Sequence, residues 1–136
     1  FMGQLVITSG SSVYVDAQIV IYTLEKVNNF CKLLLPLWKT CGRKEIKIIS
    51  SELTFMETLI GPMKKNDIQL IRTYENMLLR TEINLLPITL SILKTAVTLR
   101  ASNNIRTPDA IHIATALETK CNLFLTNDLG FIKNYK

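Results

Sequence analysis

Histidine and cysteine are scarce in this sequence, and their scarcity limits the chemistry that the chain can perform. Its single histidine is His112, and its three cysteines, Cys31, Cys41 and Cys121, form no CxxC pair. A structural zinc site draws four ligands from these residue types, so the sequence argues against one. An odd number of cysteines without paired spacing is typical of reduced thiols in a cytosol. No serine or cysteine is placed to complete a catalytic triad with His112, which disfavours a protein nucleophile.

Long apolar runs and export signals are also lacking. Polar residues and a proline interrupt the longest apolar region, 85–99, before it reaches the roughly 18 residues that a membrane span requires. The N-terminus has no basic segment followed by an apolar one and a cleavage site, so we expect a cytoplasmic protein that does not enter a membrane. With 136 residues, 48% of them hydrophobic, and no repeat or low-complexity linker, the chain is expected to form one domain over residues 1–136.

The charges that are present favour basic residues. The chain has 16 lysines and arginines against 11 acids, a net charge of +5. If several of the acids lie together in one site, the rest of the surface is more positive still. A negative pocket ringed by positive surface suits a protein that holds metal ions and binds a polyanion. A basic surface that only keeps the protein soluble is the alternative, and net charge does not separate the two.

Short β-rich runs alternate with helical patterns along the chain. The patterns predict strands at 13–16, 46–49, 83–86 and 122–126. They predict helices at 19–27, at 30–40, from Ser50 or Ser51 to Gly61-Pro62, from Asn66 or Asp67 to about 81, at 89–101, and at 109–119 with Thr107 as N-cap and Pro108 in the first helical position. Such alternation implies an α/β fold, a three-layer α/β/α sandwich with a central parallel sheet.

Four acids lie where this fold brings residues together: Asp16, Glu57, Asp109 and Asp128. Asp16 and Asp128 each close an apolar strand, and the carboxyl ends of parallel strands meet at one edge of a sheet. Asp109 stands in the first turn of a helix, and Glu57 lies in the middle of another. Several buried carboxylates are unfavourable together unless they share protons or surround a cation. An all-oxygen ligand set suits Mg²⁺ or Mn²⁺.

Each acid also has a structural interpretation. Asp16 could cap the helix that begins near Ile19, Asp109 could stabilise a helix dipole, and Asp128 could belong to an Asx turn. Glu57 gains nothing from capping, and Glu52 in the first turn of the same helix is the reserve candidate. The joint occurrence of the four acids favours a site.

Several other residues are candidates for supporting roles. Lys64, Lys65 and Arg106 stand near the expected rim and could bind phosphates, although ordinary solvation of helix ends explains them equally well. A structural role for His112, at the pocket rim or a subunit contact, is favoured over a catalytic one because a partner is missing. Tyr14 and Tyr22 are expected in the core.

Four segments of the sequence carry a resemblance to a known family. They are Val13-Tyr14-Val15-Asp16, residues 51–62 (Ser-Glu-Leu-Thr-Phe-Met-Glu-Thr-Leu-Ile-Gly-Pro), residues 107–117 (Thr-Pro-Asp-Ala-Ile-His-Ile-Ala-Thr-Ala-Leu) and Phe124-Leu125-Thr126-Asn127-Asp128. In order and spacing, over about residues 13–131, the chain resembles the PIN-domain ribonucleases and, more narrowly, the VapC-type toxins of toxin–antitoxin pairs. The resemblance implies a PIN-like fold of Rossmann-type topology, a metal-dependent endoribonuclease that acts on RNA with Mg²⁺ or Mn²⁺, a homodimer, and inhibition by a small antitoxin.

The resemblance also implies roles for individual residues. Asp16, Glu57, Asp109 and Asp128 become the catalytic, metal-binding cluster, and Thr126 and Asn127 its supports. Two departures stand against this. The family often has Thr or Ser and then Asn after the first Asp, whereas this chain has Ala17-Gln18, and many relatives continue into a final strand that is short or missing here.

Two other functions compete with the nuclease. One is a catalytically degenerate module of the same fold that only binds RNA or a protein, which the Ala17-Gln18 departure favours. The other is a phosphoacceptor or phosphatase-like domain with Asp16 as nucleophile. The latter is disfavoured because haloacid-dehalogenase-type enzymes have a second Asp two residues after the first, and position 18 is Gln.

Overall fold

A four-stranded parallel sheet forms the centre of the chain. The computed structural model describes residues 10–25 and 30–126. Within them the strands are β1 (Ser12–Val15), β2 (Lys47–Ser51), β3 (Asn84–Leu86) and β4 (Leu123–Leu125), in the order β3-β2-β1-β4. Every neighbouring pair of strands is parallel, which confirms the predicted sheet.

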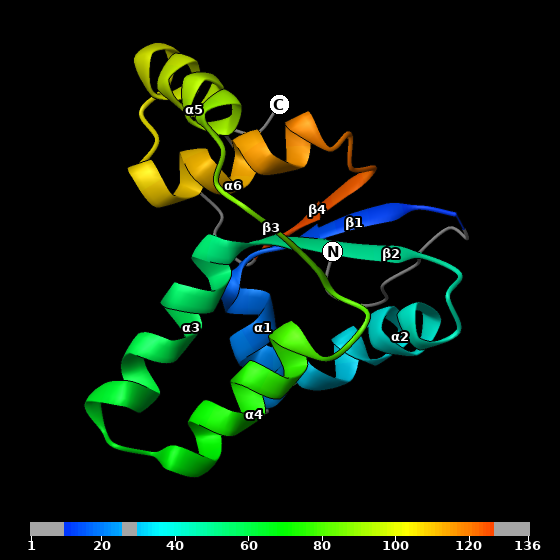
Figure 1. Cartoon of the computed structure of the whole chain (residues 1–136). Helices are drawn as coiled ribbons and strands as arrows, with labels where there is room; N and C mark the ends of the chain where they lie inside the picture. The colour runs from blue at the N-terminus through cyan, green and yellow to red at the C-terminus, as the bar shows by residue number, and fades with distance from the viewer. Residues whose placement is uncertain (1–9, 26–29, 127–136) are drawn as a thin grey trace.

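Six helices in the described residues cover the two faces of this sheet. They are α1 (Ala17–Leu24), α2 (Phe30–Gly42), α3 (Glu52–Lys64), α4 (Ile68–Leu79), α5 (Leu90–Ser102) and α6 (Thr107–Glu118). Helices α5 and α6 lie on one face, and α1 to α4 lie on the other (Figure 1). The predicted three-layer α/β/α architecture is therefore confirmed. No helix in the described ranges has the length and apolar character that crossing a membrane requires.

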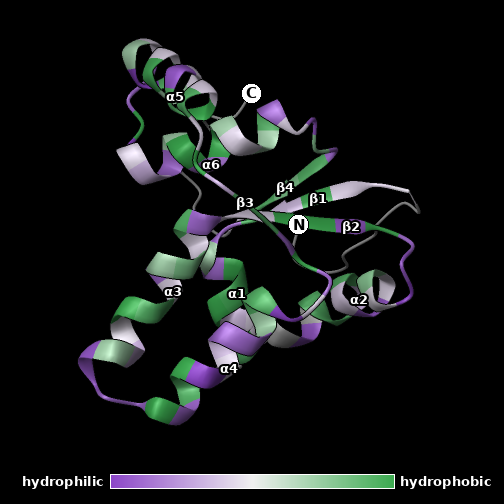
Figure 2. Ribbon diagram, viewed as in Figure 1, coloured by the Kyte–Doolittle hydropathy of each residue, from purple (hydrophilic) through white to green (hydrophobic). Residues whose placement is uncertain are grey.

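The central strand β1 is buried on both faces, as expected for a strand inside a parallel sheet. Val13, Tyr14 and Val15 are each 0% exposed. Because side chains alternate along a strand, Val13 and Val15 join the cluster formed with α1, α2 and α4, while Tyr14 joins Ile49 and Ala116 on the opposite face. Figure 2 shows hydrophobic residues along the strands of the sheet.

Helix α3 runs past the point where the sequence predicts its end. We expected it to stop at Gly61-Pro62, but it continues to Lys64, with Pro62 buried in its last turn. A proline close to the C-terminal end removes only one backbone hydrogen bond, and here its ring gains contacts in the core. The prediction was wrong because it weighed the local penalty without this packing.

The start of α6 also differs from its prediction. Thr107 is the first helical residue rather than the N-cap, and Arg106 occupies the cap position without a side-chain cap hydrogen bond. The Thr107 hydroxyl instead accepts a hydrogen bond from Nη1 of Arg100 at 2.9 Å. This contact fixes the loop before α6 to the end of α5, and it places Asp109 in the first turn.

The carboxyl ends of the strands meet at one edge, as the sequence predicts. Val15 of β1 pairs with Leu125 of β4, so the residues that follow, Asp16 and Thr126, leave adjacent strands side by side. Strand β2 passes directly into α3, whose N-cap Ser51 accepts a hydrogen bond from the Leu53 amide. The fold therefore directs α1, α3 and α6 to the same edge of the sheet.

Candidate functional site

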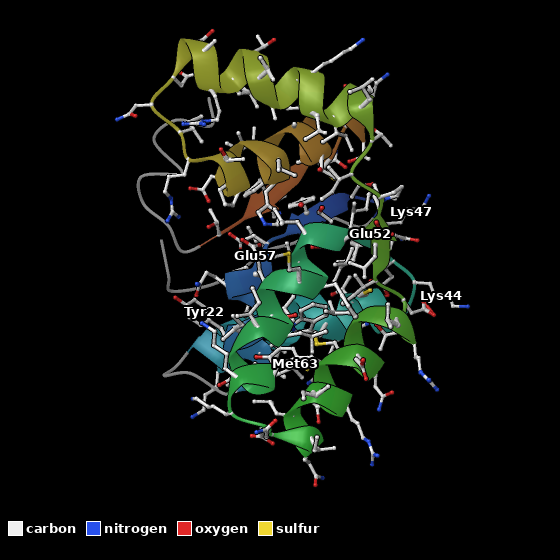
Figure 3. All side chains as sticks on the ribbon, turned by 60° about the vertical axis from the view of Figure 1, so that its left-hand side comes forward. Tyr22, Lys44, Lys47, Glu52, Glu57 and Met63 are labelled. Carbon is white, nitrogen blue, oxygen red and sulfur yellow. The ribbon has the colours of Figure 1, made fainter. Side chains whose placement is uncertain are left out.

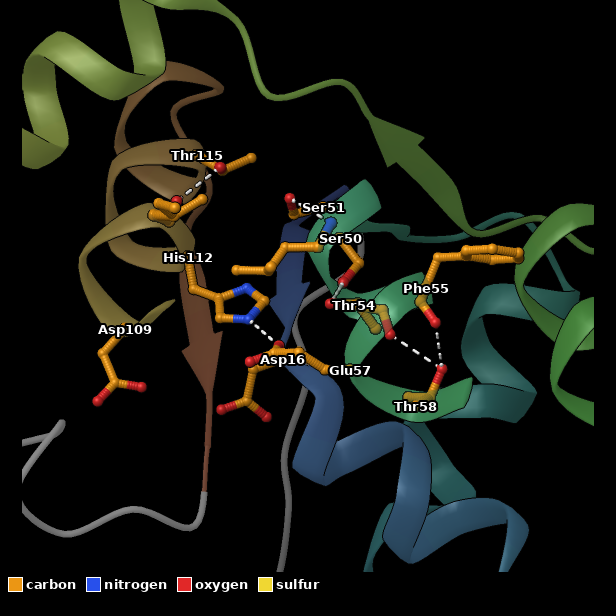
Figure 4. Close-up of polar contacts among 12 residues, drawn as sticks. Asp16, Ser50, Ser51, Thr54, Phe55, Glu57, Thr58, Asp109, His112 and Thr115 are labelled. Carbon is orange, nitrogen blue, oxygen red and sulfur yellow. Dashed lines mark hydrogen bonds and ion pairs between the residues drawn. The ribbon is translucent and has the colours of Figure 1, made fainter. Parts of the chain in front are cut away.

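A pocket of about 550 Å³ lies at this edge of the sheet. Its lining comes from α1, α3 and α6: Asp16, Ala17, Gln18, Ile21, Tyr22, Glu57, Arg106, Asp109 and His112. Three of the four predicted acids, Asp16, Glu57 and Asp109, therefore share one pocket, and Figure 4 shows them around His112. The fourth acid, Asp128, and its neighbour Asn127 lie outside the described residues.

Asp16 forms the buried floor of the pocket and is 5% exposed. It is also the N-cap of α1, where its Oδ1 accepts a hydrogen bond from the Ile19 amide at 3.2 Å. The capping interpretation and the site interpretation are thus both compatible with the structure. Burial raises the pKa of Asp16, and the charge of Glu57 adds to this rise. Hydrogen bonds from the Thr126 side chain and the Ile19 amide oppose it, as does the electrostatic influence of the nearby His112 ring. The Thr126 side chain thus forms a hydrogen bond with the Asp16 carboxylate, and its role as a support of the acidic cluster stays a prediction.

Replacement of Asp16 by asparagine is expected to stabilise the fold at neutral pH. The folded-state pKa of Asp16 lies above its ordinary value of 3.8, so the folded protein binds more protons than the unfolded chain between these two values. The contribution of Asp16 to the free energy of unfolding is therefore fully present below the ordinary pKa. It is lost as the pH rises through the folded-state pKa and the buried carboxyl group ionises. Asparagine caps a helix equally well and carries no charge to desolvate. Urea unfolding of both proteins across the acidic to neutral range measures the difference.

The matched control for this substitution is Asp67→Asn. Asp67 caps α4 by accepting a hydrogen bond from the Leu70 amide at 3.1 Å, but it is exposed to solvent. Its replacement should leave the pH profile of stability unchanged. An Asp16→Asn protein whose stability relative to wild type stays constant from acidic to neutral pH would contradict the assigned burial effect.

Glu57 reaches the pocket from the middle of α3, and His112 binds it there. The Glu57 side chain is 30% exposed, and its Oε1 lies 2.7 Å from Nε2 of His112. On the other side of the ring, Nδ1 of His112 lies 2.6 Å from the Tyr14 hydroxyl. His112 is 2% exposed, so its predicted place at the pocket rim is wrong: the ring is buried in the pocket wall.

The structure separates the three basic residues that the sequence suggests for phosphate binding. Arg106 lines the pocket, and its Nε lies 3.1 Å from Oδ2 of Asp109. The Arg106 side chain is 76% exposed, so this ion pair contributes little to stability. Lys64 and Lys65 are exposed at the far end of α3 and do not line the pocket; Figure 3 shows Met63 well along the helix from Glu57.

Tyr14 and Tyr22 were both expected in the core. Tyr14 is fully buried, which confirms that expectation, and its ring stacks on Phe124 at a centroid distance of 5.0 Å. Tyr22 is only partly buried. It packs against the main core cluster, but it also forms part of the pocket lining.

The pocket offers oxygen ligands of the kind that a hard divalent ion prefers, although they are not arranged as a finished metal site. Among the described residues, no three Asp, Glu, His or Cys side chains form a group that could hold an ion. Instead, each carboxylate faces a nitrogen donor: Asp16 the Ile19 amide, Glu57 the His112 ring and Asp109 the Arg106 guanidinium. These N–H donors lie where a bound cation would otherwise balance the charge of the carboxylates. By chemistry, the carboxylates fit a hard divalent ion.

The sequence model of the PIN domain family matches residues 13–136 of this chain. No curated protein sequence matches it. The matched range begins at the second residue of β1 and includes all the candidate site residues.

Several solved structures share the fold over most of their length. A toxin–antitoxin complex from Klebsiella pneumoniae is 26% identical, with a TM-score of 0.65, and the match covers 88% of this chain and 89% of that one. VapBC2 from Rickettsia felis, solved with a DNA fragment from its promoter, is 16% identical with a TM-score of 0.70, covering 90% and 92%. VapC20 from Mycobacterium tuberculosis, a toxin that cleaves the sarcin–ricin loop, is 14% identical with a TM-score of 0.73, covering 89% and 93%.

Proposed function

The chain belongs to the PIN-domain family, and we propose on this basis that it is a metal-dependent endoribonuclease that hydrolyses RNA phosphodiester bonds. One observation supports the proposal most: Asp16, Glu57 and Asp109 meet in one pocket, although each comes from a different helix or helix start. The three residues span 93 positions of the chain, from 16 to 109, and neither capping nor solubility requires them to meet. A shared anionic pocket is what a nuclease needs to hold a divalent ion against its substrate.

The residues of the pocket have distinct roles in this proposal. Asp16 and Asp109 are the central ligands of Mg²⁺ or Mn²⁺, with Glu57 and Asp128 completing the ligand set. When bound, the ion supplies Lewis-acid stabilisation of the phosphate oxygens and lowers the pKa of an attacking water. Thr126 holds the Asp16 carboxylate in place. Arg106, exposed at the mouth of the pocket, binds a non-bridging phosphate oxygen through its planar guanidinium.

We further propose that the chain is the toxin of a toxin–antitoxin pair. The toxin–antitoxin complex from Klebsiella pneumoniae is related at 26% identity over most of both chains, and this likeness supports the proposal. The expected partner is a small antitoxin that places an Arg or Lys among the pocket acids and blocks the ion. Free thiols at Cys41 and Cys121 are compatible with a cytoplasmic location. The homodimer remains a prediction from the family resemblance.

A catalytically degenerate module that binds RNA or a protein is the second candidate. Ala17 lines the pocket beside Asp16, at the position where the family often has a hydroxyl, so one possible support of the acidic cluster is missing. Such a module would bind RNA with the salt dependence of a basic protein but leave it uncut.

Removal of divalent ions is expected to abolish RNA cleavage. The purified protein is incubated with total cellular RNA in Mg²⁺ or Mn²⁺, and fragments are followed by gel and by sequencing of the new ends. Cleavage should fall to background in EDTA and return when excess ion is added, because in this proposal the ion activates the attacking water. The same preparation of Asp16→Asn controls for contaminating ribonuclease. Cleavage that persists in EDTA would refute the metal mechanism, and RNA binding without cleavage would favour the degenerate module.

A further inference from the structure

A buried line of hydrogen bonds leads from the sheet to the pocket. The Tyr14 hydroxyl lies 2.6 Å from Nδ1 of His112, and Nε2 of the same ring lies 2.7 Å from Oε1 of Glu57. Tyr14 is 0% and His112 2% exposed, and the two rings meet edge to face at a centroid distance of 5.7 Å. We call this arrangement the Tyr14–His112–Glu57 chain. Its last link is drawn as a dashed line in Figure 4.

The chemistry of the two outer groups fixes the direction of both hydrogen bonds. An ionised Glu57 carboxylate can only accept, so Nε2 of His112 must carry the proton and donate it. In a neutral ring Nδ1 then has a free lone pair, which accepts from the Tyr14 hydroxyl. A phenol is protonated at neutral pH, so the Tyr14 hydroxyl is the donor of this hydrogen bond. Tyr14 therefore selects the one tautomer of His112 that can bind Glu57.

Glu57 needs such a partner to stay in the pocket. Its side chain is long and 30% exposed. The charge of Glu57 raises the pKa of Asp16, so the two carboxylates repel each other in the pocket. Without a donor, the carboxylate would gain hydration and lose repulsion by turning to solvent. The contact with His112 occupies Oε1 alone. Within the described part of the chain, no hydrogen bond or ion pair of Oε2 is present, so that oxygen remains available to a ligand.

We propose that His112 is a positioning residue: its Nε2–H holds Glu57 in the pocket with Oε2 directed to the divalent ion, and Tyr14 fixes the tautomer that allows this. The inference rests on the proposed function, because it assigns a role to His112 in the same site. In this role His112 acts through Glu57, to which Nε2 is hydrogen-bonded. His112 restricts the Glu57 side chain before an ion binds, so binding costs less conformational entropy. Groups behind metal ligands raise affinity in this way.

The tautomer can be observed directly, because His112 is the only histidine of the chain. Protein labelled with ¹⁵N-histidine and freed of any affinity tag gives one imidazole spin system by NMR. The expected spectrum at mildly alkaline pH shows a protonated Nε2 and a bare Nδ1. Tyr14→Phe removes the hydroxyl but keeps the ring, and should convert the spectrum to a mixture of both tautomers. A wild-type ring protonated at Nδ1, or at both nitrogens, would overturn the assignment.

Binding of Mn²⁺ alone, measured by calorimetry or electron paramagnetic resonance without RNA, tests the effect on the ion. His112→Ala should weaken binding about 10-fold, as is typical for loss of a group behind a metal ligand. His112→Gln, whose amide can donate toward Glu57, should recover part of the loss. The decisive comparison is a double-mutant cycle: in a Glu57→Gln protein, His112→Ala should cost no further affinity. An equal loss in both backgrounds would refute positioning through Glu57.

Tyr74→Phe is the matched control for Tyr14→Phe. Tyr74 is also 0% exposed and donates a hydrogen bond to a carboxylate, Oε2 of Glu25, at 2.5 Å, but it lies on α4 and not in the pocket. Both variants should lose some stability, and only Tyr14→Phe should change Mn²⁺ affinity and the His112 spectrum. If Tyr74→Phe weakens Mn²⁺ binding as much as Tyr14→Phe does, the effect is general destabilisation and the inference fails.

Failure of the inference and failure of the proposed function give different results. If the tautomer and the Mn²⁺ cycle behave as expected but RNA is not cut, His112 still positions Glu57 and the nuclease assignment is wrong. If RNA is cut with Mg²⁺ or Mn²⁺ but His112→Ala leaves Mn²⁺ affinity unchanged, the nuclease stands and the positioning role is refuted.

Discussion

The Asp16→Asn variant is expected to lose at least about 100-fold in RNA cleavage while it folds as well as wild type. Substitution of a group behind a metal ligand already costs about 10–100-fold, and Asp16 is proposed to hold the ion itself. Asparagine has almost the same shape and accepts the same hydrogen bond from the Ile19 amide, so the start of α1 is preserved. The substitution removes one negative charge. Asp16 is 5% exposed, so solvent screens this charge only weakly. Initial rates on a defined RNA, at saturating Mn²⁺, measure the loss.

The same substitution at another helix start provides the control. Asp67→Asn exchanges one N-cap carboxylate for an amide on α4, away from the pocket, and should retain full cleavage. A second comparison is Glu52→Gln, since Glu52 was the reserve candidate and is exposed and absent from the pocket lining. It too should keep its activity. Near-normal cleavage by Asp16→Asn, or an equal loss in Asp67→Asn, would remove Asp16 from the site.

The elements and three of the four acids were predictable because the rules involved are short in range. The run Val13-Tyr14-Val15 is apolar on both faces, which identifies an inner parallel strand without knowledge of its neighbours. The position of Asp16 then follows, since the residue after such a strand lies at the carboxyl edge. Asp109 was located by the helix start at Thr107-Pro108, although the cap itself was assigned one residue too late. The fourth acid, Asp128, stays a prediction.

The role of His112 was not predictable by these rules. The sequence shows it three positions after Asp109, on the same side of α6, and this spacing was the only available signal. Its two partners stand 98 and 55 positions away, Tyr14 on β1 and Glu57 on α3. Only the packing of α6 against the sheet and of α3 beside it decides that they meet. A lone histidine without a nearby partner therefore looked structural, although its partners come from elsewhere in the fold.

Burial on α6 is another feature that periodicity described incompletely. The pattern indicates an apolar stripe of Ala110, Ile113, Ala114 and Leu117. In the structure every residue from Ala110 to Ala116 is buried, whereas Leu117 is 47% exposed. The helix lies between the sheet and α5, so it is covered on more than one side (Figure 1). The polar His112 and Thr115 on its inner side are accommodated because each is hydrogen-bonded.

The site depends on the core packing of α6, because this helix is enclosed and carries site residues. Ile113→Ala is expected to lower the free energy of unfolding by about 2–5 kcal/mol. Ile113 is 1% exposed and lies in the cluster between α5 and α6, on the helix that also carries Asp109 and His112. Loss of its side chain leaves a cavity that neighbouring alanines cannot fill. Denaturant unfolding at neutral pH measures the change.

Leu117→Ala removes a similar apolar side chain from the same helix at an exposed position, and it should change the free energy of unfolding by about 0.5 kcal/mol or less. A difference in stability between the two variants therefore reports on the burial of the side chain and not only on the loss of an apolar residue from the helix. If α6 is held as described, Ile113→Ala should also raise the exchange rate of the α6 backbone amides more than that of the α4 amides, because local opening of α6 becomes easier. Equal destabilisation by the two substitutions would mean that α6 is not enclosed, and the geometry that brings Asp109 and His112 to Glu57 would lose its support.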